Sequence, residues 1–544
     1  MPSTWQQHYT PLAASVGWSA LAAALPIFVL LFLLGVKRQP AWAAALAGLG
    51  AAVSVAWAVY RMPPDMLLSA VLYGAAFGLF PIGWITFSAI LLYRLTVETG
   101  KFELIKTSIG GVTSDRRLQA LLIAFAFGAF IEGAAGSGVP VAVAAAMLTG
   151  LGFAPFHAAA ICLLANTAPV AYGAIGTPIL TLAGTTGLPL DRLSAAVGRI
   201  CAPISLIVPA YLTVLIAGRR GWRGVLPAFV VCGASFASVQ FLVSNFVGPQ
   251  LTDILGSMAA MGCLLLLFRF WRPKDQSHWE NTAVAPAESR AYHRSELWRA
   301  WMPYLLLAVS VLAWGVPAVH SFLGSATVSL EWPLLHNRIQ RVPPIVNAPA
   351  AYRAVYDFDS LACAGTACLI AGLLAAAYLR VSPREYGRVF AGTLRQMRLP
   401  LLTIATVLGL AFLMNYSGQT ATLGLAFAAT GKWFPYFSSM LGWLGVFLTG
   451  SDTSSNALFG NLQVVAAKRL QMNPILMASS NSSGGVMGKM ISLQSIAVAV
   501  AATGMQTSDE SKLFRFTLRH SLLLASAIGL ITTCYAYLVP SWMP

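Results

Sequence analysis

The sequence predicts an all-α polytopic membrane protein, with about 12 transmembrane helices plus two re-entrant hairpins. Of its 544 residues, 57% are hydrophobic and 10% are charged, whereas about 25% of the residues in a typical soluble domain are charged. Long apolar segments recur along the chain, and the short loops between them hold most of the Lys and Arg residues. Two of the apolar segments are interrupted by polar, glycine-rich clusters at 131–138 and 450–456.

The basic loops set the expected topology. A formal net charge of +16 would indicate nucleic-acid binding in a soluble chain, but here the positive charge gathers between apolar segments, as in cytoplasmic loops. We therefore expect no nucleic-acid partner. The loops assigned to the cytoplasm are 37–38, 101–117, 219–223, 272–299, 380–398 and 512–519. Both termini then lie outside, and the first apolar segment is expected to be a retained span.

The crossings follow in order from hydropathy and from these loops. They are predicted at 16–36, 41–60, 66–95, 156–187, 196–217, 224–246, 249–271, 301–320, 360–379, 399–417, 474–505 and 519–539. The seven cysteines lie in or beside apolar runs and have neither metal-ligand spacing nor a disulfide framework. We expect buried thiols, no metal site and no cofactor.

Two apolar segments are predicted to be re-entrant hairpins rather than crossings. In 119–152 and 436–468, an arm of about 14 residues stands on each side of the polar cluster, whereas a span needs about 20 residues. Each arm is expected to reach about halfway across the bilayer. The segments that follow, 156–187 and 474–505, are too long for one straight span and are interrupted by small and polar residues, so we expect discontinuous helices.

The order span, span, hairpin, broken span, span occurs twice, over about 41–217 and about 360–539, and the charge assignment reverses its direction the second time. This pattern is typical of inverted-repeat transporters, whose sites lie where broken elements meet. The predicted regions are an amino-terminal span (1–40), repeat 1 (41–217), connecting spans (218–359) with an inside loop (272–299) and an outside loop (321–359), and repeat 2 (360–544). The alternative is a membrane protein with glycine-rich helix packing alone.

Several long motifs resemble those of the L-lactate permease family. They are GAFIEGAAG at 128–136, NTAPV at 166–170, GTPI at 176–179, EWPLLHN at 331–337, RVPPIV at 341–346, NYSG at 415–418, LTGSDTSSNALFG at 448–460, NSSGGV at 481–486 and GKMIS at 488–492. The resemblance covers nearly the whole chain. It implies proton-coupled import of L-lactate and related 2-hydroxy monocarboxylates, including D-lactate and glycolate, across the bacterial inner membrane.

A proton symporter needs a group that binds the proton. Glu132 is the first candidate, because poor solvation near a hairpin tip favours the neutral form of a carboxyl group. Asp452, in the second cluster, is the symmetry-related alternative. The competing interpretations are that Glu132 is a fixed structural acid and that Asp452 caps a helix.

An anionic substrate needs hydrogen-bond donors and positive charge. The start of each hairpin's second arm, around Ser137-Gly138 and Ser455-Asn456, offers free N–H groups and a favourable helix dipole. Lys489 could hold the substrate carboxylate or pair with Asp452. Further amides and hydroxyls could bind substrate oxygens or could instead satisfy backbone groups freed by the broken helices; they belong to Asn166, Thr167, Thr177, Asn456, Asn481, Ser482 and Ser483.

Other function classes are less well supported. A passive monocarboxylate channel or an anion exchanger could use the same hairpins. An intramembrane enzyme with Ser137 or Ser451 as nucleophile lacks a histidine in either hairpin to activate the serine. The sequence therefore favours a transporter whose partners are a monocarboxylate, a proton and the lipid bilayer.

Overall fold

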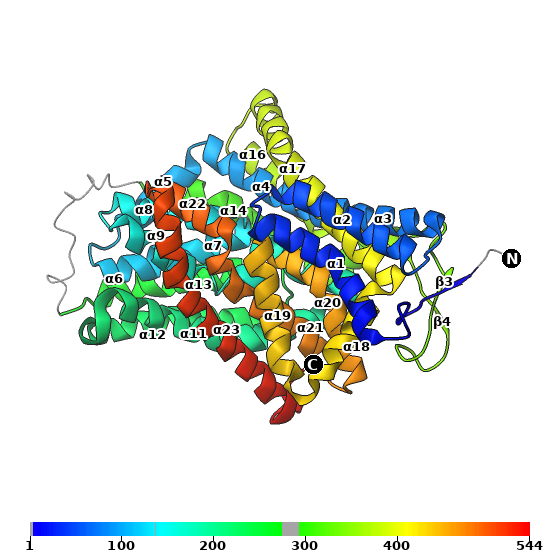
Figure 1. The fold of residues 1–544 in the computed structure, drawn as a ribbon. Helices are drawn as coiled ribbons and strands as arrows, with labels where there is room; N and C mark the ends of the chain where they lie inside the picture. Colours follow the sequence, from blue (N-terminus) through cyan, green and yellow to red (C-terminus); the bar gives the residue numbers. More distant parts are fainter. Residues whose placement is uncertain (1–3, 137, 275–292) are drawn as a thin grey trace.

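The computed structural model describes residues 4–136, 138–274 and 293–544, and nearly all of its regular structure is helical (Figure 1). In this part of the chain, ten helices are long and apolar enough to cross a membrane, and two bent helix pairs pass the same test together. The predicted fold class is confirmed. Much of the predicted loop 272–299 lies outside the described residues.

The helices of the first half follow the predicted order, with one long crossing made of three consecutive helical segments. They are α1 (Val16–Gly35), α2 (Ala41–Ala58), α3 (Pro64–Phe77), η1 (Gly78–Gly83), α4 (Trp84–Glu98), α5 (Lys101–Gly110), α6 (Arg116–Gln119), η2 (Ala120–Phe127), α7 (Gly128–Ala134), α8 (Val139–Gly150), α9 (Pro155–Ala165), η3 (Val170–Tyr172), α10 (Gly173–Thr186), α11 (Leu190–Gly221), η4 (Trp222–Val225), α12 (Leu226–Phe246) and α13 (Thr252–Phe270).

The described structure of the second half begins with the helix that starts at Arg294. Its helices are α14 (Arg294–Gly315), α15 (Pro317–Gly324), α16 (Ala364–Tyr378), α17 (Pro383–Ser417), α18 (Gln419–Phe427), η6 (Ala428–Trp433), α19 (Phe434–Thr449), α20 (Asp452–Arg469), α21 (Pro474–Gly488), η7 (Lys489–Ile491), α22 (Leu493–Thr503), η8 (Thr507–Asp509), α23 (Glu510–Tyr537) and η9 (Pro540–Trp542). The start of α17 projects beyond the other helices in Figure 1.

The predicted outside loop 321–359 contains strands that the sequence reading did not anticipate. β1 (Trp5–Gln6) pairs in parallel with β3 (Ile339–Arg341), which pairs with β4 (Ala350–Ala351), and β2 (Val328–Glu331) pairs with β5 (Val355–Phe358). The Gln7 side chain donates hydrogen bonds to the carbonyls of Asn415 and Tyr416, at 2.9 and 2.8 Å. The amino-terminal segment is thus held against this region and against the end of α17.

Both predicted hairpins are present, but the expected arm lengths were wrong. The first arm runs continuously from Arg116 to Ala134 and is long enough to cross a membrane, while the second arm, α8, has 12 residues. In the second hairpin, α19 has 16 residues and α20 has 18. The helices take in part of the polar clusters, since α7 ends at Ala134 and α20 begins at Asp452. The first arm also begins at Arg116, next to the buried ion pair of Arg117 with Asp115.

Both predicted broken helices are also present. The helical axis bends by 64° between α9 and the segment Val170–Thr186, and by 40° between Pro474–Ile491 and α22. In the first break, Ala174, Ile175 and Gly176 have φ values of 45°, 59° and 72°. A left-handed conformation is unusual for a β-branched residue and costs about 1–3 kcal/mol, so the surrounding packing must hold this turn in place.

The hairpins and broken helices pack reciprocally across the molecule. α10, the second half of the first broken helix, packs against α20 of the second hairpin; α22, the second half of the second broken helix, packs against α8 of the first hairpin. The largest apolar core surrounds these elements together with α11, α12 and α13, while a second core joins α1, α2, α3 and α17. The four interrupted elements therefore meet inside the protein.

Candidate functional site

The tip of the first hairpin holds a buried acid. Glu132 lies on α7 and is 4% exposed, and its Oε2 accepts a hydrogen bond from Asn166 Nδ2 at 3.2 Å. Asn166 is the residue at which α9 ends, so the hairpin tip and the first helix break are joined directly. Gly173 makes room for the carboxyl group, because a Cβ there would lie 2.6 Å from Glu132 Oε1.

The tip of the second hairpin holds a second buried acid. Asp452 is the first residue of α20, and the Ser451 hydroxyl before it caps this helix. Asp452 Oδ2 accepts hydrogen bonds from Ser482 Oγ at 2.5 Å and from Asn456 Nδ2 at 3.3 Å. Since Ser482 lies on α21, this acid also joins a hairpin tip to a broken helix, and the capping of α20 is done by Ser451 instead.

Two asparagines connect the halves of the chain. Asn481 Nδ2 donates to Asn456 Oδ1 at 2.9 Å, and Asn456 Nδ2 also donates to the Pro178 carbonyl at 3.1 Å, a contact between residues 278 positions apart. Gln463, which the sequence reading did not single out, donates to Asn481 Oδ1 at 3.2 Å. A hydrogen-bonded chain thus runs from α20 and α21 to the break in the first repeat.

Lys489 supplies a positive charge that interacts with both acids. Its side chain is buried, and Nζ donates to the Gly450 carbonyl at 2.5 Å. That carbonyl belongs to the C-cap of α19, where a cation is favoured by the helix dipole. The ammonium group also interacts electrostatically with Glu132 and Asp452. The structure therefore brings together the three charged residues that the sequence singled out.

The remaining predicted residues divide by what they contact. Thr167 and Thr177 donate to the carbonyls of Leu164 and Ala174, so in this structure they satisfy backbone groups. Ser455 likewise donates to the Gly442 carbonyl. Ser483 lies beside the thiol of Cys201.

The start of α8 is only partly described. Gly138 is its N-cap and has a φ of +82°, a value that favours glycine. Ser137 lies outside the described residues.

One buried acid at the site was not predicted from the sequence. Asp253, on the first turn of α13, packs against Gly133: a Cβ on that glycine would lie 2.9 Å from Asp253 Cβ. It also interacts electrostatically with Glu132. The signal was available, because Asp253 falls inside the predicted span 249–271 and an acid within a span is itself an indication of function.

Some acceptor atoms at the site lack partners. Within the described residues, Asn166 Oδ1, Asp452 Oδ1 and both oxygens of Asp253 are buried without a hydrogen bond. Buried polar atoms are nearly always satisfied, and exceptions require an explanation such as a proton, a water molecule or a ligand. The arrangement can therefore accept protons and polar ligand groups at these atoms.

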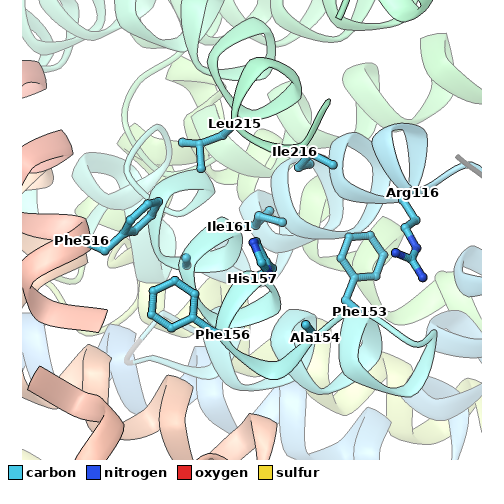
Figure 2. A pocket seen from close by; sticks show the side chains of 10 residues that line it. Arg116, Phe153, Ala154, Phe156, His157, Ile161, Leu215, Ile216 and Phe516 are labelled. Carbon is cyan, nitrogen blue, oxygen red and sulfur yellow. The ribbon is translucent and has the colours of Figure 1, made fainter. Parts of the chain in front are cut away.

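The pocket in Figure 2 lies away from these acids. It has a volume of about 420 Å³ and opens where α9 begins, between Arg116, Phe153, His157 and Phe516. His157, on the first turn of α9, is exposed there. Glu132, Asp452 and Lys489 do not line this pocket. Their side chains are buried, so the charged cluster is closed to solvent in this conformation.

Comparison with known proteins identifies the family. The family model for L-lactate permease matches residues 19–539. The chain belongs to the L-lactate permease family. An L-lactate permease of Bacillus subtilis is 46% identical, and the alignment covers 99% of both chains. The glycolate permease GlcA of Escherichia coli is 43% identical, covering 98% of both.

Membership of the L-lactate permease family indicates a membrane transporter rather than an enzyme. Among solved structures, the YdaH transporter of Alcanivorax borkumensis aligns over 87% of this chain and 88% of its own, with 16% identity and a TM-score of 0.49. With this identity and TM-score, the structural similarity supports no conclusion about this permease.

Proposed function

We propose that this protein imports L-lactate and related 2-hydroxy monocarboxylates, including D-lactate and glycolate, by proton symport across the bacterial inner membrane, with both termini outside. The substrate class follows from its relatives, which are named as permeases for L-lactate and for glycolate. The observation that carries the mechanism is the buried cluster of Glu132, Asp452 and Lys489, where the hairpin tips meet the broken helices.

In the proposed site, Lys489 attracts the substrate carboxylate. Its ammonium group lies at the tip of the second hairpin, where it donates a hydrogen bond to the Gly450 carbonyl. The start of α20 adds free backbone N–H groups and the positive end of a helix dipole, both of which favour an anion. Asn166, whose Oδ1 has no partner in the described part of the chain, can accept a hydrogen bond from the 2-hydroxyl group. The other residues that we propose for substrate binding are Gly138, Thr167, Thr177, Ser455, Asn456, Asn481, Ser482 and Ser483, together with Ser137, which lies outside the described residues.

A co-transported proton makes import of an anion feasible. A cell interior that is negative by 100 mV opposes each entering negative charge by about 2.3 kcal/mol, and one proton per monocarboxylate removes this electrical term. Each pH unit of gradient then contributes about 1.36 kcal/mol. Glu132 is the proposed proton carrier, because it is buried, near Lys489, and hydrogen-bonded at only one oxygen in the described contacts. Asp452, held by Ser482 and Asn456, is the alternative carrier.

Uptake of labelled L-lactate into proteoliposomes tests the proposal. With the outside two pH units more acidic, an electroneutral symporter should accumulate lactate up to about 100-fold, since each pH unit corresponds to a factor of ten. A protonophore should abolish this accumulation. Uptake that only equilibrates would instead establish a passive channel, and accumulation driven only by preloaded anion would establish an exchanger.

The substitution Glu132→Gln tests the proton role separately. It keeps the size of the side chain and one acceptor oxygen for Asn166, but it cannot bind or release the proton. Asp65→Asn is the control, because Asp65 is an exposed acid at the start of α3. We expect Glu132→Gln to lose accumulation and Asp65→Asn to retain it. A folded Glu132→Gln protein that still accumulates lactate would assign the proton to another acid, with Asp452→Asn as the next variant.

A further inference from the structure

Asp253 is buried without any hydrogen bond. It is 1% exposed, and neither of its carboxyl oxygens has a hydrogen-bond partner among the described residues. Burying an ionised carboxylate without a partner is highly unfavourable, so such a group either carries a proton or is paired in another state of the protein.

The place of Asp253 at a helix start does not explain it. An acid on the first turn normally accepts hydrogen bonds from the free N–H groups of that turn, but Asp253 accepts none within the described structure. The neighbouring Thr252 hydroxyl donates to the Gly248 carbonyl. The Asp253 side chain therefore does not cap α13. It lies against the first hairpin instead.

The ionisable groups that interact electrostatically with Asp253 come from three elements. α7 contributes Glu132, which lies next to the close contact between Gly133 and the Asp253 Cβ. η3 contributes Tyr172, whose hydroxyl donates to the Ser194 carbonyl at 2.6 Å. α11 contributes Cys201. The charged group that acts on Asp253 is therefore Glu132, and Lys489 acts in turn on Glu132.

We propose that Asp253 is the relay acid of this permease: the proton that accompanies the substrate reaches and leaves Glu132 through Asp253, across the contact between α7 and α13. This inference rests on the proton symport proposed above. In the transfer step, a water molecule that bridges the two carboxyl groups passes the proton: the O–H bond of Asp253 breaks as its proton moves to the water, and an O–H bond forms on Glu132 as the water gives up another proton. During this transfer the pair of carboxyl groups keeps one proton and one negative charge.

Charge balance then links the proton to the substrate. Without substrate, Lys489 compensates an ionised Glu132, and Asp253 holds the proton. When the substrate carboxylate takes over Lys489, Glu132 loses its counter-charge and accepts the proton from Asp253. The negative charge of the Asp253 carboxylate is then buried without a counter-charge, so Asp253 takes up one proton from solution. Binding of one monocarboxylate thus draws in one proton.

The test uses the full-length permease in proteoliposomes and compares two modes of transport. Exchange of labelled for unlabelled lactate at equal pH needs no proton release from Glu132, whereas accumulation driven by a pH gradient does. For Asp253→Asn, we expect the initial rate of accumulation to fall at least 10-fold while exchange stays within about 3-fold of wild type. Asp253→Glu, which keeps the carboxyl group, should restore most of the accumulation rate.

Ser257→Ala is the matched control on the same helix. The Ser257 hydroxyl donates to the Ile254 carbonyl within α13, so its removal should leave both transport modes unchanged. The melting temperature of each variant in detergent shows that it is folded. If Asp253→Asn does not fold, labelling of wild-type Asp253 by dicyclohexylcarbodiimide, read by mass spectrometry, takes its place, because this reagent modifies protonated carboxyl groups in apolar surroundings.

The outcomes separate the two proposals. If wild type accumulates lactate and Asp253→Asn does so equally fast, Asp253 is not the relay. Equal loss of exchange and accumulation in a folded Asp253→Asn protein would also overturn the relay, as would absence of carbodiimide labelling at acidic pH. If wild type itself only equilibrates lactate, proton symport fails, and the relay fails with it.

Discussion

Where α19 and α21 cross, their backbones are in contact. We therefore predict that the glycines at this crossing cannot be replaced by larger residues without a loss of stability. A Cβ on Gly442 would lie 1.9 Å from the Asn481 carbonyl oxygen, and a Cβ on Gly484 would lie 2.0 Å from the Ser439 carbonyl oxygen. The obstructing atoms are backbone atoms, so no side-chain rotation relieves the overlap. Such small-residue crossings let transmembrane helices approach closely.

The cost of Gly442→Ala follows from these distances. A carbon normally approaches a carbonyl oxygen to about 3.3 Å, so the contact of 1.9 Å forces the helices apart by about 1.4 Å. The 2.5 Å hydrogen bond from Ser482 to Asp452 cannot survive that displacement, because it spans from α21 to the tip that α19 supports. Overpacking costs about 1–3 kcal/mol and loss of a bond to a charged group about 1.5–3 kcal/mol.

The assay measures thermal unfolding in detergent and lactate uptake for the same protein. We expect Gly442→Ala to be destabilised by about 2.5–6 kcal/mol and to lose uptake. Gly50→Ala is the control, because Gly50 also lies inside a helix, α2, and a Cβ there meets nothing within 4 Å. If Gly442→Ala matches Gly50→Ala in both measurements, the close approach of α19 and α21 is not real.

Three further predictions concern residues that lie outside the long apolar helices. Asp115→Ala removes the carboxylate that is ion-paired with the buried guanidinium of Arg117 and should cost about 3–5 kcal/mol; an unchanged unfolding temperature would contradict this. Gln7→Ala frees two buried carbonyls at the end of α17 and should lower stability by about 1–3 kcal/mol, measured against Gln6→Ala, whose side chain is exposed. Burial raises the pKa of Asp359; its protonated form therefore stabilises the fold fully below the unfolded pKa of about 3.9, and this contribution is lost as pH rises through the higher folded pKa. Asp359→Asn should flatten that part of the melting temperature's pH dependence, and a slope equal to wild type would refute the assignment.

The sequence predicted the interrupted elements well because their signals are local. Glycine and small polar residues inside apolar segments marked both hairpin tips and both broken helices, and the structure bends close to those places. The arm lengths were wrong because residues of the polar clusters are themselves helical: α7 ends at Ala134 and α20 begins at Asp452, whereas the sequence pattern predicted turns there. The strands of the 321–359 region were missed because each has at most four residues and depends on partners elsewhere in the chain.

In the candidate site, too, some residues were predicted from the sequence and one was found only in the structure. Glu132, Asp452 and Lys489 stood out because each is a charge inside an apolar segment, where burial is costly. Asp253 carried that signal too, yet its position near the start of a predicted span resembled that of an ordinary helix-end acid. Its missing hydrogen bonds became evident only once α13 was packed against α7.

The sequence by itself determined that this chain is a helical membrane protein, where its helices break, and which charges lie at the breaks, because hydropathy and backbone flexibility are properties of a few neighbouring residues. Tertiary structure alone decided which of these groups meet. The bond from Asn456 to the Pro178 carbonyl joins residues 278 positions apart, and the contact between Asp253 and the first hairpin depends on how whole helices pack. Such contacts are fixed by the combined burial of many side chains, and no short segment encodes them.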